Sequence, residues 1–251
     1  MSVLLEAHRG VSNEYPENTI ASLRAAKELG YAMIEVDTKF TSDDKCVLLH
    51  DYTLNRTGRN PDGSKIEHEL KIADITLDEA RKFDVGLHKG ERFRDEKVPT
   101  LEEVIDFAKK AKIPLKFDNV LWTHKPEQRK IMFDMLKKSG IDFGITCSSI
   151  VQTGELLANI PNPVVHFDGA VSEETLAELS KLIPADRLYV WMRFDNQITS
   201  WNKTPPVDEN FAALVKKHGR LGVWLLTTDE ESERAEQLGA YIAETDGRLR
   251  P

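Results

Sequence analysis

Glu35 and Asp37 form the pattern in this sequence that is best suited to chemistry. They alternate with Ile34 and Val36 in a short apolar segment typical of a β-strand, so both carboxylates point to the same side of it. If that side faces the inside of the fold, the acids must be neutralised or change their pKa values. A hard divalent cation such as Mg²⁺ or Ca²⁺ is the usual compensation. The other interpretation is a polar strand face in contact with water.

Other reactive side chains also follow apolar segments. Asp118 is a candidate third oxygen ligand for the cation. His8 and His50 are a candidate acid–base pair, because imidazole exchanges protons near neutral pH. Arg9, beside His8, has a planar guanidinium that fits a phosphate or a carboxylate. For the remaining histidines a structural role is the simpler interpretation; these are His68, His88, His124 and His218.

Strand-like and helix-like segments alternate along the chain and indicate what positions these side chains. Apolar residues at helical spacing, with capping residues before them or glycines behind them, predict helices over 17–29, 99–112, 125–138, 152–160, 172–183, 207–218 and 230–238. Eight predicted strands are centred on Leu4, Ile34, Leu115, Ile145, Val165, Val190, Val223 and Ile242.

Eight strands joined mostly by single helices predict an α/β fold of the (β/α)8, or TIM, barrel type. A doubly wound open sheet would need a glycine-rich phosphate-binding turn after the first strand, and the sequence has none. We expect one domain over residues 1–251. A small insertion after strand two, at about 52–97, is expected to form a partly ordered cap that is entered through a strand at 46–50. In a barrel the site lies at the carboxyl ends of the strands, where the candidate residues occur.

Composition excludes several functional classes. The net charge of −8 and the pI near 5.5 argue against the basic surface that nucleic-acid binding needs. No apolar run approaches the ~20 residues of a membrane span, and the start is too short for a signal peptide, so we expect no integral membrane association and a cytoplasmic protein. Cys46 and Cys147 lie far apart and predict neither a disulfide framework nor a zinc site.

Several motifs resemble the glycerophosphodiester phosphodiesterase family. They are His8-Arg9-Gly10, Pro16-Glu17-Asn18-Thr19, Glu35-Val36-Asp37, His50-Asp51 with Leu54 and Arg56-Thr57, Pro99-Thr100-Leu101-Glu102-Glu103-Val104, Val223-Trp224 and Thr245-Asp246. The resemblance is dense over residues 6–105 and weaker from there to 215. It implies a (β/α)8 barrel that uses a divalent metal ion to hydrolyse glycerophosphodiesters, small-molecule substrates, to sn-glycerol 3-phosphate and an alcohol.

The resemblance also implies roles for individual residues. His8 and His50 are the acid–base pair, and Arg9 contacts the phosphate. Glu35 and Asp37 are metal ligands.

The third strand departs from the family pattern. The family's third ligand is usually a glutamate, followed two residues later by a lysine that binds phosphate, whereas this sequence has Asp118 and Val120. Asp118 binds the metal directly, through water or not at all. Unless another cation replaces the lysine, we expect weak or altered activity. Arg193, near the end of strand six, is the candidate replacement, and its other interpretation is an ion pair with Asp168 or Asp195.

Two other functions remain open at this point. A phosphodiester lyase or transferase of the sphingomyelinase D type shares the barrel and would stop at a cyclic phosphate. A barrel that only binds a phosphorylated or sugar-like ligand is also consistent with the missing lysine.

Strand parity and aromatic residues give two further expectations. Glu6 lies two residues before His8, and Lys116 two before Asp118, so we predict a buried Glu6–Lys116 ion pair beneath the site. Trp191, Trp201 and Trp224 either shape the substrate pocket, with Trp224 a candidate substrate contact, or pack in the core.

Overall fold

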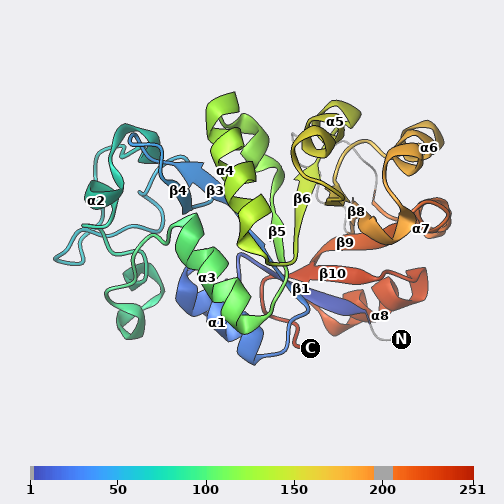
Figure 1. Cartoon of the computed structure of the whole chain (residues 1–251). Coiled ribbons are helices and arrows are strands. Elements are labelled where there is room, and N and C mark those ends of the chain that lie inside the picture. The colour runs from blue at the N-terminus through green and yellow to red at the C-terminus, as the bar shows by residue number, and fades with distance from the viewer. Residues whose placement is uncertain (1–2, 195–205) are drawn as a thin grey trace.

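A computed structural model describes residues 3–194 and 206–251 of the chain. Eight parallel strands close into a barrel in the order β1-β10-β9-β8-β7-β6-β5-β2 (Figure 1). They are β1 (Leu4–His8), β2 (Met33–Val36), β5 (Leu115–Phe117), β6 (Phe143–Cys147), β7 (Val164–Phe167), β8 (Leu188–Arg193), β9 (Arg220–Leu226) and β10 (Ile242–Thr245). The predicted (β/α)8 barrel is confirmed, and each of the eight predicted strand centres falls within one of these strands.

Helices cover the outside of the barrel (Figure 1). They are α1 (Ile20–Glu28), α3 (Leu101–Ala111), α4 (Pro126–Ser139), α5 (Ile150–Asn159), α6 (Glu173–Leu182), α7 (Glu209–Lys216) and α8 (Asp229–Leu238). Thr100 is the predicted N-cap of α3, and its hydroxyl accepts a hydrogen bond from the Glu103 backbone N–H. Helix α1 begins three residues later than predicted, because Asn18 has a left-handed φ of 55° and Thr19 is the N-cap.

The two faces of the barrel strands carry different side chains. Outward-facing residues such as Ala7, Ile34 and Phe117 pack against the helices in the main apolar core. Inside the barrel, Trp191 and Tyr189 belong to a smaller apolar cluster, and charged side chains occupy the neighbouring positions. This alternation follows from the period of two along each strand and aims polar groups at the barrel mouth.

The segment between β4 and α3 contains the predicted insertion. The hairpin β3 (Thr38–Phe40) and β4 (Cys46–Leu48) leads into it, and it contains α2 (Leu77–Ala80) with three short 3₁₀ turns. An apolar cluster of its own, which includes Leu54, Ile66, Ile72 and Val85, holds the segment together. In Figure 1 it extends from one side of the barrel. The strand predicted at 46–50 is present in shorter form, and its partner β3 was not predicted.

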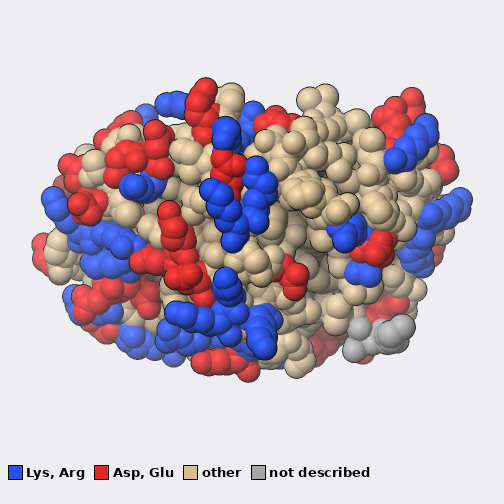
Figure 2. Space-filling view, viewed as in Figure 1, with Lys and Arg blue, Asp and Glu red and all other residues tan. Residues whose placement is uncertain are grey.

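Lysine, arginine, aspartate and glutamate side chains are intermingled on the face shown in Figure 2. Among the described residues, no helix combines the length and the apolar character that crossing a membrane requires.

Gly222 tests how tightly the inside of the barrel is packed. A Cβ at this position would lie 2.7 Å from the ring of Trp191, whose indole N–H is fixed by a 2.8 Å hydrogen bond to His166 Nδ1. We expect Gly222→Ala to lower the free energy of unfolding by about 1–3 kcal/mol, measured by urea denaturation. Gly154→Ala on α5, where no atom lies within 4 Å of the new Cβ, is the control and is expected to stabilise by roughly 0.5–1 kcal/mol. Equal effects of the two changes would contradict this account.

Candidate active site

A cavity of about 310 Å³ opens at the carboxyl ends of the barrel strands. Its lining contains eight residues predicted from the sequence to form or shape the site: His8, Arg9, Glu35, Asp37, His50, Asp118, Trp191 and Trp224. A second cavity of about 700 Å³ shares Asp37, His50, Asp118 and Asp168 with the first and extends along the start of the insertion at Tyr52. The structure therefore brings the two histidines, the arginine and the three acids together.

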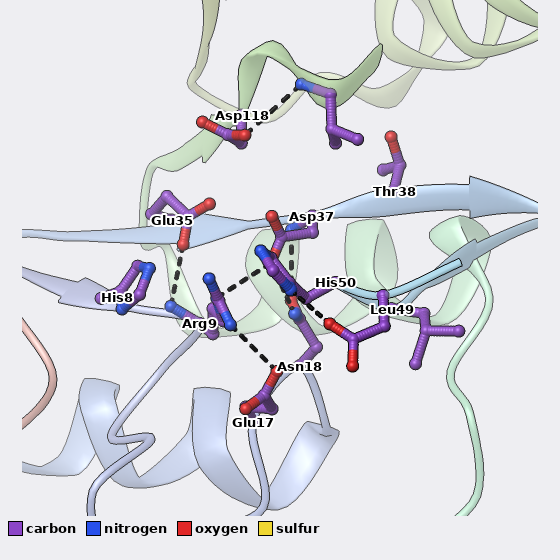
Figure 3. A network of polar contacts seen from close by, with 12 residues as sticks. His8, Arg9, Glu17, Asn18, Glu35, Asp37, Thr38, Leu49, His50 and Asp118 are labelled. Atoms are coloured by element: carbon purple, nitrogen blue, oxygen red, sulfur yellow. Dashed lines mark hydrogen bonds and ion pairs between the residues drawn. The ribbon is translucent and has the colours of Figure 1, made fainter. Parts of the chain in front are cut away.

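Arg9 connects Glu35 on β2 and Asp37 just after it to the turn that follows β1 (Figure 3). Its backbone N–H donates to Glu35 Oε2 at 2.9 Å, and its Nε lies 3.2 Å from Asp37 Oδ2. Its Nη1 donates to Glu17 Oε1 at 3.1 Å. Asn18 Nδ2 also donates to Asp37, at 2.8 Å. The side chain of Asp37 is thus held by one cation and one amide.

The turn after β1 depends on residues that accept unusual backbone angles. Arg9 has a φ of 57° and Gly10 a φ of 80°. A Cβ on Gly10 would lie 2.8 Å from the backbone carbon of Ser22, so only glycine lets this turn approach α1. The Ser22 hydroxyl then donates to the Arg9 carbonyl at 3.0 Å. The His-Arg-Gly sequence therefore places both Arg9 and the start of α1 against the acids.

The acids at the barrel mouth crowd one another. Burial raises the pKa of Glu35 well above its ordinary value, and the charge of Asp37 adds to this. Burial and Asp37 also raise the pKa of Asp118. Burial, followed by the charge of Asp118, raises the pKa of Asp168 to about 7. A cation among these groups would relieve the repulsion.

The donor set fits a hard divalent cation in its chemistry, because it consists of carboxylate oxygens on one cavity wall. Within residues 3–194 and 206–251, no group of three or more His, Cys, Asp or Glu side chains is arranged as a metal site. Glu35 and Asp37 use oxygens for Arg9 and Asn18 instead. Ligation by Glu35, Asp37 and Asp118 therefore requires some of these contacts to be exchanged.

His50 is backed by a chain of ion pairs from the insertion. Its Nδ1 lies 2.6 Å from Asp51 Oδ1, and Arg56 Nε donates to Asp51 Oδ2 at 2.7 Å. Arg56 also donates two 2.7 Å hydrogen bonds to Glu17. Burial alone would raise the pKa of Glu17, but hydrogen bonds from Arg56 and the charge of Arg9 hold it at about 2. Burial alone would also raise the pKa of Asp51, but hydrogen bonds from Arg56 and His50 hold it at about 2.

His8 is backed by a second chain inside the barrel. Lys116 Nζ lies 2.5 Å from Glu6 Oε1, so the predicted ion pair is confirmed. It also lies 2.5 Å from Glu244 Oε2, and Glu244 Oε1 lies 3.7 Å from His8 Nε2. Burial lowers the pKa of His8, and Glu244 opposes this.

One lysine cannot neutralise both of these buried glutamates. Burial raises the pKa of Glu6 to about 8 despite Lys116. Burial also disfavours ionised Glu244, but Lys116 and His8 hold its pKa at about 2. Of the two glutamates, Glu244 is therefore the one that Lys116 and His8 favour as the charged form, and it faces His8.

Several predicted residues lie elsewhere or stay untested. Arg193 is buried on β8 and does not line either cavity, so its role in replacing the lysine stays a prediction. Val120 lines the second cavity. Trp201 and Asp195 lie outside the described residues.

The sequence reasoning missed Glu244, and it named Arg56, Glu17 and Asn18 only as parts of family motifs, without a role. Glu244 had a detectable signal, since it is an acid in the apolar last strand and shares the parity of Ile242, which faces inward. Arg56 reaches its partners through a fold of the insertion that local patterns do not reveal.

Known proteins match both the sequence and the fold. Residues 8–141, which are 134 of the 251 residues, match the sequence profile of the Glycerophosphoryl diester phosphodiesterase family. The chain belongs to this family. It is 43% identical over 106 residues to a glycerophosphodiester phosphodiesterase of Caldanaerobacter subterraneus, a match that covers 42% of this chain and 40% of that protein. It is 30% identical over 205 residues to glycerophosphodiester phosphodiesterase 1 of Bos taurus, covering 74% and 58% of the two chains.

The chain therefore matches less than two thirds of the length of these family relatives. Solved structures with the same fold cover it almost completely. A phosphodiesterase of Oleispira antarctica, solved with the product sn-glycerol-3-phosphate, superposes with a TM-score of 0.77 at 20% identity and covers 98% of this chain and 94% of its own. A glycerophosphodiester phosphodiesterase of Thermotoga maritima gives 0.67 at 20% identity, covering 99% and 96%. At this identity the structures establish the shared barrel.

The Arg56 bridge between Glu17 and Asp51 is expected to make stability depend on pH. Both acids have folded-state pKa values of about 2, below their ordinary values of 4.5 and 3.8. A depressed pKa stabilises the fold above the ordinary value, and this contribution is lost as the pH falls towards 2. We expect Arg56→Gln to lower the free energy of unfolding by about 1 kcal/mol near pH 6, a small effect because the arginine is partly exposed. The effect is expected to shrink as the pH falls, because Glu17 and Asp51 take up protons. Urea denaturation across this pH range measures the difference.

Arg94→Gln is the matched control, because Arg94 pairs only with the exposed Glu91 among the described residues and is expected to contribute little at any pH. A difference for Arg56→Gln that grows towards low pH would contradict the role given to the bridge.

Proposed function

We propose that the protein hydrolyses glycerophosphodiesters to sn-glycerol 3-phosphate and an alcohol. The observation that carries this proposal is the convergence of His8, His50 and Arg9 with three carboxylates in one cavity. Membership of the family supports it. So does the bound sn-glycerol-3-phosphate in the Oleispira antarctica phosphodiesterase, whose barrel is similar.

The residues of the site divide the chemistry among them. Arg9 offers its guanidinium to a phosphate oxygen. One of the two histidines removes the proton from the attacking hydroxyl, and the other protonates the leaving alkoxide. When a hydroxyl of the glycerol attacks first, the product of that step is a cyclic phosphate, which water then opens with the histidines in exchanged roles. Asp51 orients His50 for this work through their 2.6 Å contact.

A divalent cation, Mg²⁺ or Ca²⁺, completes the proposal, as members of this family generally use one. Glu35, Asp37 and Asp118 would hold it. A bound cation would neutralise phosphate charge and lower the pKa of a hydroxyl or water. The sequence-based placement in the cytoplasm also stays a prediction.

A substrate screen tests the function directly. Purified protein is incubated with glycerophosphocholine, glycerophosphoethanolamine, glycerophosphoglycerol and lysophospholipids, and the products are identified by ³¹P NMR. A phosphomonoester supports the proposal. A cyclic phosphate as the final product indicates the lyase or transferase of the sphingomyelinase D type, and binding without turnover indicates a ligand-binding barrel.

Replacing either histidine is expected to lower kcat strongly. If His8 and His50 transfer the protons, His8→Ala and His50→Ala each reduce kcat on the order of 10²–10⁴-fold with the best substrate of the screen. His68→Ala is the control, because His68 is exposed and lines neither cavity. Unchanged kcat in the His8→Ala/His50→Ala double variant would refute the assignment.

Removal of the cation is expected to abolish turnover. EDTA treatment reduces kcat to background, and Mg²⁺ or Ca²⁺ restores it. Glu35→Gln, which replaces a charged oxygen ligand by an amide, raises the cation concentration needed for half-maximal activity. Full activity after exhaustive chelation, checked by elemental analysis of the sample, would exclude the cation from the reaction.

A further inference from the structure

Glu244 is a carboxylate at the site to which the family motifs give no role. It comes from the last barrel strand, β10, where it is register partner to Glu6 on β1. Its side chain is 11% exposed and lines the first cavity. The two carboxylate oxygens point to different partners: Oε2 to Lys116 at 2.5 Å, and Oε1 to His8 Nε2 at 3.7 Å.

Each of the two histidines of the site faces a carboxylate that is held by a cation. His50 lies at hydrogen-bond distance, 2.6 Å, from Asp51, which pairs with Arg56. His8 lies at ion-pair distance, 3.7 Å, from Glu244, which pairs with Lys116. A carboxylate beside an imidazole favours a hydrogen on the ring nitrogen that faces it and favours one orientation of the ring. The two histidines thus have similar partners, one from the insertion and one from inside the barrel, at different distances.

We propose that Glu244 is the positioning residue of His8: its carboxylate keeps the proton of the ring on Nε2 and orients the imidazole towards the substrate. The proposal rests on the proposed function in so far as His8 transfers a proton. Lys116 holds Glu244 in place and keeps it ionised, because its ammonium lies within ion-pair distance of that carboxylate and is itself covered by the ring of Trp191, 3.7 Å from the ring centroid.

Glu6 provides a matched control within the same cluster. It contacts the same lysine, is fully buried and does not line the cavity. Burial raises the pKa of Glu6, and Glu6→Gln keeps the shape of the side chain while leaving Glu244 in place. In Glu244→Gln, by contrast, Glu6 can ionise and become the counter-ion of Lys116, so the fold is expected to survive while His8 loses its negative neighbour.

The first measurement is ¹⁵N NMR of the histidine rings in the unliganded protein, with the His8 signals identified by their absence in His8→Ala. We expect a proton on His8 Nε2 in the wild type and in Glu6→Gln. We expect the ring-nitrogen shifts of His8 to change in Glu244→Gln. An unprotonated Nε2 in the wild type, or the same His8 spectrum in Glu244→Gln, would overturn the proposal. This readout does not need turnover, so it decides the role of Glu244 even if no glycerophosphodiester is hydrolysed.

The second measurement is a double-mutant cycle on kcat. Glu244→Gln is expected to lower kcat roughly 10–100-fold with KM nearly unchanged. A loss of this size is typical when a residue that orients a functional side chain is replaced. In a His8→Ala background the same change is expected to have no further effect, since a residue that acts through His8 has nothing left to orient. Glu6→Gln is expected to keep kcat within about threefold, because Glu6 does not line the cavity and the change leaves Glu244 in place. An equal loss in both backgrounds would mean a merely structural role and would overturn the proposal.

If Glu244→Gln does not fold, Glu244→Asp replaces it in both measurements. Asp keeps a negative charge near Lys116 but is one methylene shorter, so its carboxylate lies farther from His8 or from Lys116 than that of Glu244. Altered His8 shifts and a kcat loss that vanishes in the His8→Ala background support the proposal, and unaltered shifts oppose it.

Discussion

The balance of charge inside the barrel is the constraint on which the rest of the site depends. Carboxylates from β1, β2, the end of β5 and β10 lie close together at largely buried positions, where an unpaired charge is expensive. Lys116 contacts two of them at once, and burial still raises the pKa of one, Glu6. The remaining acids stay close together, with raised pKa values at Glu35 and Asp118. The barrel thus gathers acidic side chains at its mouth, and its basic side chains neutralise only some of them.

This constraint also explains why the supporting parts are polar networks rather than apolar packing. Asp37 is fixed by Asn18 and Arg9, and both of these lie at left-handed backbone positions in the turns before α1. The insertion contributes in the same way, because Arg56 bridges from it to Glu17, the acid that also holds Arg9. A strained turn costs stability, and a partly exposed ion-pair bridge contributes at most about 1 kcal/mol. In the proposed function, both set the direction of a reacting side chain.

Period-two and helical spacing were enough to locate the barrel, because each strand buries one face against helices and the other inside the barrel. The same parity predicts that Glu6 meets Lys116, and the ion pair confirms it. It also applies to Glu244, but the contacts of Glu244 with Lys116 and His8 join side chains far apart in the sequence, and local patterns do not give these contacts. Sequence patterns did not predict the β3–β4 hairpin and the Arg56 bridge for a similar reason. The insertion is shaped by its own apolar cluster and by long-range ion pairs. The motif resemblance predicted the candidate reacting groups, and the structure shows which side chains hold them.

The missing lysine at Val120 can now be weighed against the charges that are present. Of the described residues that line the first cavity, the arginine and the lysine are Arg9 and Lys116. Arg9 is already paired with Glu17 and Asp37, and Lys116 with Glu6 and Glu244. Both are already in ion pairs, so a phosphodiester that binds Arg9 shares its guanidinium with Glu17 and Asp37, in a cavity lined by more acidic than basic side chains. Lys116 therefore does not act as a simple substitute for the family lysine. A divalent cation among Glu35, Asp37 and Asp118 would reverse the sign of the potential where the phosphate must lie. If the proposed cation binds there, phosphate binding in this chain would depend more on the cation, and less on the protein's own side chains, than the family pattern implies.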